Sequence, residues 1–221
     1  MPRFLTGLGG ILFALATPAE LVDRIAATVG GSVITLSEAI LQARITAFLN
    51  EEPLPLNAEA IHRAIERLVE QRLIRREIEA GNYALADSLT AEALLAQVRQ
   101  QRFGGQPGAM AAALRAYGLT ETELRDQLQW QATVVRFVDQ RFRAGALAAL
   151  EDIQDHYREK FVPAWRARHN TPPPPLEEVE SEIEAELIQQ QVAILLDRWL
   201  NQTRTQTEIR YREDAWKGPL P

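Results

Sequence analysis

The first patterned stretch of the chain consists of two short runs of β-branched residues within 24–35, separated by Gly30-Gly31. A Gly-Gly pair permits the positive φ angles of a tight two-residue turn, so this pattern predicts a β-hairpin. The hairpin leads into Thr35-Leu-Ser-Glu38, in which the Thr35 hydroxyl and the Glu38 carboxylate have the spacing of a capping box. We therefore expect a helix to begin here and to continue to about Leu49.

From this point on, apolar residues recur mostly three to five positions apart, which predicts helices that each bury one face. Glycines and prolines separate these helices, and Pro163 is expected to kink one of them or to end its regular part. The run Pro172–Pro175 predicts a stiff, extended spacer of the polyproline type. The predicted helices cover 36–49, 57–80, 87–103, 107–117, 120–143, 147–168 and 176–205.

A final strand completes the predicted fold. Residues 207–212 alternate polar and apolar side chains and predict one strand, which is unstable alone and should pair with the N-terminal hairpin. The sequence thus predicts a mainly α fold, with a multi-helix body, a small β-hairpin and a C-terminal strand. The inward residues are predicted to be Leu124, Leu128, Val134, Val135 and Val138 in one helix, and Val179, Ile183, Leu187, Val192, Leu195, Leu196 and Trp199 in the other.

The N-terminus has the pattern of a secretory signal peptide. Arg3 precedes a short apolar run, Leu5–Leu15, and Ala14-Leu15-Ala16 supplies the small residues of a cleavage site. The run is shorter than the roughly 20 residues that a membrane-spanning helix needs. We expect export to the periplasm or secretion, with no integral membrane anchor; an N-terminal extension or a buried core helix is the alternative.

Composition excludes several kinds of chemistry. The 221 residues include no cysteine, which rules out disulfides, thiolate zinc sites and cysteine nucleophiles. A net charge of −6 disfavours nucleic acid as a partner. The three histidines are scattered, and His62 with Glu66 has the spacing of a surface ion pair. We expect no catalytic site, no metal site and no cofactor.

Two tryptophans are candidates for a binding surface, whereas a group of arginines is not. Trp130 and Trp165 lie beside the apolar stripes of their helices, where they could line a groove for apolar partners; ordinary packing, the commoner situation for tryptophan, is the alternative. The arginines of the second helix alternate with glutamates, which predicts a solvated, salt-bridged face and not a basic binding patch. These arginines are Arg63, Arg67, Arg72, Arg75 and Arg76.

Several segments, taken in order, resemble the SurA-type periplasmic chaperones. Residues 22–38 are similar to the hairpin and first helix of that family, with Gly30-Gly31 where the family often has Asn-Gly-type residues. The other matching segments are Leu68–Ile74, Tyr117–Leu128, Leu196–Leu200 and Ile209–Tyr211. The resemblance implies a SurA-N/trigger-factor-C-like helical body. Proteins of this family usually carry one or two parvulin prolyl isomerase domains before the terminal helix, and the chain departs from that pattern: residues 146–175 are much too short for one, so we expect none.

On this resemblance the chain is divided into a signal peptide, a chaperone-like domain, a linker, the elements that complete the domain, and a tail. Their bounds are 1–16, 17–145, 146–175, 176–212 and 213–221. The implied function is that of an ATP-independent holdase for unfolded outer-membrane or secreted proteins, with unfolded or nascent exported polypeptides as partners. A non-catalytic adaptor or structural module and a degenerate peptidyl-prolyl isomerase are the alternatives. The residues predicted to contact clients are Phe103, Met110, Tyr117, Trp130, Phe137 and Trp165.

Overall fold

The structure is a computed structural model, and it describes residues 23–54, 57–106 and 108–218. The predicted signal peptide, residues 1–16, lies outside the described residues, as does Pro107, the expected first residue of the fourth helix.

A small antiparallel sheet joins the two ends of the described chain. Strand β1 (Ile25–Val29) pairs with β2 (Ser32–Thr35) on one side and with β3 (Ile209–Tyr211) on the other, which gives the order β2-β1-β3. Gly30 and Gly31 form the turn with φ angles of +53° and +92°, which side chains with a Cβ disfavour. The predicted hairpin and its pairing with the C-terminal strand are both confirmed.

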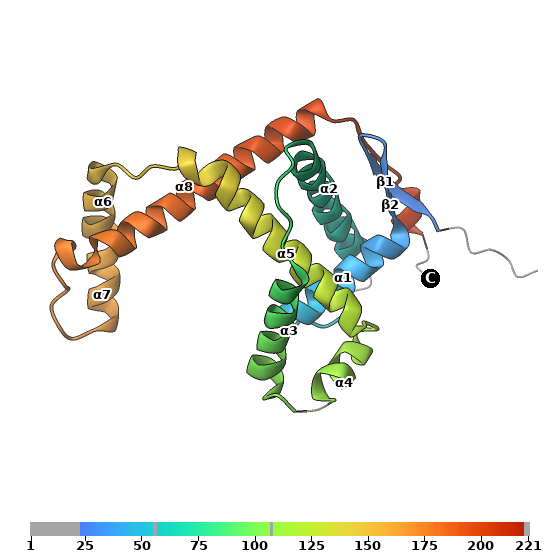
Figure 1. Ribbon diagram of the computed structural model, residues 1–221, viewed down its shortest axis with the longest axis horizontal. Coiled ribbons are helices and arrows are strands. Elements are labelled where there is room, and N and C mark those ends of the chain that lie inside the picture. The colour runs from blue at the N-terminus through green and yellow to red at the C-terminus, as the bar shows by residue number, and fades with distance from the viewer. Residues whose placement is uncertain (1–22, 55–56, 107, 219–221) are drawn as a thin grey trace, which may run out of the picture.

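Helices make up most of the remaining structure, so the mainly α prediction is confirmed (Figure 1). Thr35 and Thr120 each form a complete capping box at the start of a helix, as the sequence predicts. The helices are α1 (Leu36–Asn50), α2 (Ala58–Ala80), α3 (Ser88–Phe103), α4 (Ala109–Ala116), α5 (Glu121–Phe142), α6 (Leu150–His156), α7 (Val162–Arg168), α8 (Leu176–Gln206) and α9 (Asp214–Lys217), with a 3-10 turn at Arg143–Gly145.

The segment predicted as one helix over 147–168 starts later and is interrupted. A π-helical turn, Tyr157–Phe161, separates α6 from α7, and Pro163 is the second residue of α7. Proline has no N–H to donate to the carbonyl four residues earlier, and a wider turn accommodates this break without ending the helix. The expectation that Pro163 disturbs the regular helix is therefore confirmed.

Hydrogen bonds from Tyr157 and Trp165 tie the segment between α7 and α8, which contains the proline spacer, to the preceding helical residues. The Tyr157 hydroxyl donates a hydrogen bond to the carbonyl of Pro174 at 2.7 Å, and Trp165 Nε1 donates to the carbonyl of Thr171 at 3.1 Å. These bonds hold the chain against α6 and α7 until α8 begins.

Four separate hydrophobic clusters support the fold. The first packs the sheet on α1, α2 and α9, and the second joins α3 and α4 to the ends of α1 and α5. The third joins α2, α5 and α8, and the fourth lies between α6, the π-helical turn and the first half of α8. Val135 is a correction, because it was predicted to face inward and is 70% exposed. Its neighbours Val134 and Val138, one helical turn apart, take the inward face instead.

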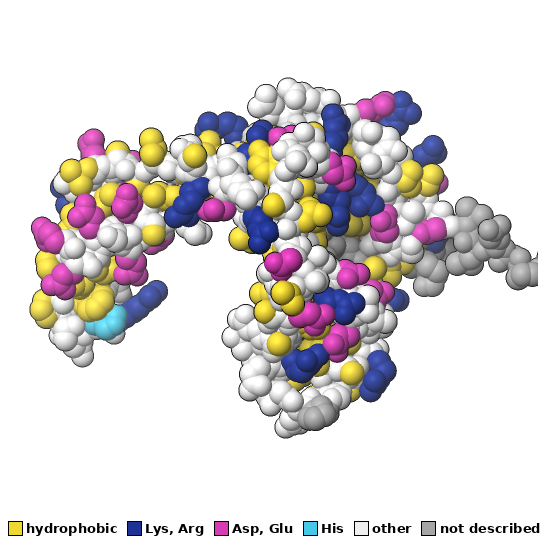
Figure 2. Space-filling view, viewed as in Figure 1, with side chains coloured by type: hydrophobic (Ala, Val, Ile, Leu, Met, Phe, Trp, Pro, Cys, Tyr) yellow, Lys and Arg dark blue, Asp and Glu magenta, His cyan; other side chains and the backbone are white. Residues whose placement is uncertain are grey.

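Helix α8 connects the parts of the molecule. Its 31 residues make it roughly 46 Å long, and it runs from α6 and α7 past α5 and α2 to β3 (Figure 1). We call residues 146–191, which comprise α6, α7 and the first half of α8, the limb. Figure 2 shows a wide open concavity between the limb and the lobe formed by α3 and α4.

Candidate functional site

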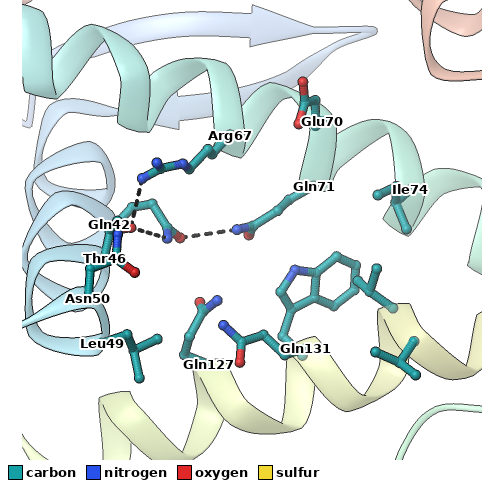
Figure 3. A pocket seen from close by; sticks show the side chains of 13 residues that line it. Gln42, Thr46, Leu49, Asn50, Arg67, Glu70, Gln71, Ile74, Gln127 and Gln131 are labelled. Atoms are coloured by element: carbon teal, nitrogen blue, oxygen red, sulfur yellow. Dashed lines mark hydrogen bonds between the residues drawn. The ribbon is translucent and has the colours of Figure 1, made fainter. Parts of the chain in front are cut away.

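An open groove of about 690 Å³ is bounded by α1, α2 and α5 (Figure 3). Carboxamides from all three helices line it, and its apolar lining consists of Leu49 of α1, Ile74 of α2, and Trp130, Val134 and Val135 of α5. Pairs four residues apart, such as Gln127 and Gln131 on α5, lie on one helix face and so point the same way. The other carboxamides of the groove belong to Gln42, Asn50 and Gln71.

A short hydrogen-bond chain fixes the polar side chains of α1 and α2 that face the groove. Gln71 Nε2 donates to Gln42 Oε1 at 3.1 Å, and Gln42 Nε2 donates to Thr46 Oγ1 at 3.3 Å. Arg67 donates to the same Thr46 hydroxyl at 3.0 Å. Gln42, which is buried, is thereby satisfied at both its oxygen and its nitrogen.

The two glutamines on the α5 side are different. Among the described residues, neither Gln127 nor Gln131 has a partner for its side-chain carboxamide, and both line the groove. A primary amide offers both an N–H donor and a carbonyl acceptor, the same two groups that a peptide unit presents. These two residues can therefore bond an extended main chain whatever its side chains are.

Trp130 lines the groove, although only 8% of it is exposed and it packs in the third cluster. The guanidinium carbon of Arg75 lies 3.9 Å from the centroid of its ring. Burial, together with the nearby Arg72, lowers the pKa of Arg75, although an arginine remains charged at neutral pH. Leu49, Ile74 and Val134 extend the apolar surface around the ring.

The groove also contains a partly desolvated carboxylate. Burial raises the pKa of Glu70 above its ordinary value, and the nearby Glu66 acts in the same direction, although Arg204 and Arg67 oppose the shift. A raised pKa means that the folded protein holds the ionised form less favourably than the unfolded chain does.

We expect Glu70→Gln to raise Tm slightly at pH 7, by about 1–2 °C, because it removes this partly buried charge. The gain should shrink as the pH falls through the raised pKa and vanish below the unfolded-state value, where the carboxyl is neutral in both states. Thermal melts at pH 7 and pH 3.5 measure this. Glu182→Gln, at an exposed position of α8, is the control and should change Tm at neither pH; an equal gain in both variants would contradict the assignment.

A network next to the groove fastens the end of α8 and β3 to α2. Arg204 donates to Glu66 Oε2, and the Tyr211 phenol lies near the same carboxylate. Burial and this carboxylate raise the pKa of Tyr211 to about 12.

The structure distributes the six predicted client-contacting residues over four places. Trp130 lies in the groove, and Trp165 lies on the limb, partly buried. Phe137 is fully buried in the third cluster and serves packing there. The other three, Phe103, Met110 and Tyr117, belong to the second cluster, in which the rings of Phe103 and Tyr117 contact that of Phe48.

Sequence patterns indicated Trp130 but not the carboxamides that accompany it. Glutamine is common on exposed helix faces, so Gln42, Gln71, Gln127 and Gln131 carry no distinctive signal. One available signal was their spacing: Gln127 and Gln131 flank Trp130 on the helix face next to its apolar stripe.

The polar clusters that resemble metal sites do not form one. His62 Nε2 lies 3.7 Å from Glu66 Oε1, both partly exposed, as the predicted ion pair requires. Within the described ranges, no group of three or more potential metal ligands comes together. Every helix in the part of the chain that the structure describes is too short or too polar to cross a membrane.

Part of the chain is similar in sequence to SurA chaperones. Over 120 residues it is 29% identical to the chaperone SurA of Cupriavidus pinatubonensis, covering 53% of this chain and 24% of that protein. Over 133 residues it is also 29% identical to the chaperone SurA of Chromobacterium violaceum, covering 58% of this chain and 30% of that protein. No protein-family model matches the chain.

The chain is thus a SurA-like relative over somewhat more than half of its length, and it spans less than a third of the length of these curated relatives. Both relatives are named as chaperones, which supports the interpretation that the chain is not an enzyme.

Proposed function

We propose that the protein is an ATP-independent exported chaperone that holds unfolded outer-membrane or secreted polypeptides in extended form. The observation that carries this proposal is the groove, which the unpaired carboxamides of Gln127 and Gln131 line together with the exposed edge of the largely buried Trp130. Such a surface suits many sequences, because the amides bond the main chain and the ring accepts an apolar side chain. The similarity to SurA chaperones supports the same assignment.

The shape of the molecule is compatible with weak binding spread over a long segment. The groove is open along its length, and the concavity between the limb and the α3–α4 lobe leaves room for a polypeptide to pass (Figure 2). Ordering an unfolded client costs conformational entropy, so each contact contributes little and affinity grows with the length bound.

Val135 gives a direct test of the groove, since it lines the groove and is 70% exposed. We expect Val135→Glu to weaken binding of a fluorescent, aromatic-rich, unstructured peptide about tenfold, because it places a charge where an apolar side chain should pack. Fluorescence anisotropy with the full chain measures this affinity.

Leu89→Glu is the matched control. Leu89 is 78% exposed near the start of α3, outside the groove, and the change adds the same charge. It should alter the affinity less than twofold, and circular dichroism should show both variants folded. If both variants weaken peptide binding equally, or if Val135→Glu does not weaken it, the groove is not the binding site.

A further inference from the structure

The negative charge of the protein is concentrated in the limb. Residues 146–191 contain ten acidic and four basic side chains, a net charge of −6, which equals the net charge of the whole chain. The remainder of the chain is therefore balanced, with acidic and basic residues in equal number. Figure 2 shows several of these acidic side chains along the limb.

A cleft of about 270 Å³ opens in this acidic part, between α6 and α8. One side is apolar and comes from Leu147, Ala148 and Leu187. Leu147 is 79% exposed, so a large aliphatic side chain stands at the edge of the cleft without a packing partner that covers it.

The other side of the cleft carries carboxylates. Asp152, Asp155 and Glu159 come from α6 and the π-helical turn, at spacings that bring them to one face. Asp155 is paired with Arg158, and Lys160 also lines the cleft. Asp152 and Glu159 form no ion pair with any residue that the structure describes.

A buried histidine, His156, also lines the cleft. The His156 side chain is only 7% exposed, and its Nε2 lies 3.5 Å from Glu186 Oε2 on α8. Its Nδ1 is buried and has no hydrogen-bond partner among the described residues. Buried polar atoms are usually hydrogen-bonded, so an unsatisfied one on a residue that lines the cleft is unusual.

We propose that this cleft binds the side chain of an arginine or lysine in a client polypeptide. Such a side chain has an apolar stem and a cationic head, and the cleft offers an aliphatic wall for the stem and the free carboxylates of Asp152 and Glu159 for the head. This inference rests on the proposed chaperone function and adds a preference: clients with basic residues near their apolar segments bind better than neutral ones.

Two peptides and two double variants of the full chain test this inference. The peptides are unstructured and rich in aromatic residues, and they are identical except that the arginines of one are glutamines in the other. We expect the arginine peptide to bind the unmodified protein about tenfold more tightly in fluorescence anisotropy. Asp152→Asn with Glu159→Gln should remove most of this difference and leave the affinity for the glutamine peptide unchanged.

Glu182→Gln with Glu184→Gln is the matched control, since both residues are exposed on α8 outside the cleft and the change in charge is the same. It should reduce the preference for arginine less than twofold. An equal reduction in both double variants would overturn the proposed binding in the cleft, because it would show that the overall negative charge of the limb causes the preference. Equal binding of the two peptides by the unmodified protein would overturn the inference while the chaperone proposal stands, whereas binding of neither peptide would count against both.

Discussion

Replacing Phe137 with alanine is expected to lower the free energy of unfolding by about 3–5 kcal/mol, the largest loss of any single change considered. The Phe137 side chain is fully buried. Its ring centroid lies 5.0 Å from that of Tyr83, 6.0 Å from that of Phe142 and 5.8 Å from that of Trp199. The substitution therefore leaves a cavity where α5, α8 and the segment after α2 meet.

Thermal unfolding followed by circular dichroism measures this effect, and Tm should fall by about 10 °C. Val135→Ala, on the same helix but exposed, is the control and should change the free energy of unfolding by less than about 0.5 kcal/mol. Comparable losses for the two variants would contradict the assignment of Phe137 to the core.

The second large effect is expected from Ile183→Ala, and it should be confined to the limb. Ile183 is 1% exposed and is packed with Ile153 and Val179 in the fourth cluster, so its truncation should destabilise that cluster by about 2–5 kcal/mol. The clusters that support the sheet and the other helices share no buried residue with it. The limb can therefore open locally while the body stays folded.

Amide hydrogen exchange followed by mass spectrometry separates local from global opening. Peptides from 150–190 should lose protection in Ile183→Ala, while peptides from α2 keep it. Glu182→Ala, the adjacent exposed position, should leave both regions unchanged. A uniform loss of protection over the whole chain would show that the limb is not an independent unit.

Local sequence signals predicted the elements that depend on local chemistry. The Gly30-Gly31 turn and the Thr35 and Thr120 capping boxes each need only a few neighbouring residues, and the structure has all of them. Val135 shows where such reasoning ends, because Val134, Val135 and Val138 span only about 100° of a helix, and periodicity alone allows all three to face inward. Which of them does depends on how α5 packs against α2 and α8, and this is a tertiary property.

The ion-pair partners of charged residues also depend on tertiary structure and could be predicted only in part. The glutamates and arginines of α2 were predicted to pair with one another on a solvated face. Arg63 does pair with Glu59 on its own helix, but Arg72 pairs with Glu38 of α1 and Glu66 with Arg204 of α8. Helix α2 is central and contacts several elements, so its long side chains reach across to them.

The groove was only partly predictable for a related reason. A tryptophan beside an apolar stripe is a recognisable signal, and Trp130 lines the groove. The carboxamides become significant only when α1, α2 and α5 are placed around them, because each is an ordinary helix-surface residue in the sequence. The acidic cleft likewise needs α6 to lie against α8.

The measurement that tests the proposed function most directly is light scattering of an outer-membrane β-barrel protein diluted from urea, with and without residues 17–221 and without ATP. The chaperone proposal predicts that near-stoichiometric amounts of the folded protein suppress the scattering, and that Val135→Glu suppresses it less than Leu89→Glu. Undiminished scattering in the presence of protein that circular dichroism shows to be folded and helical would contradict the proposal.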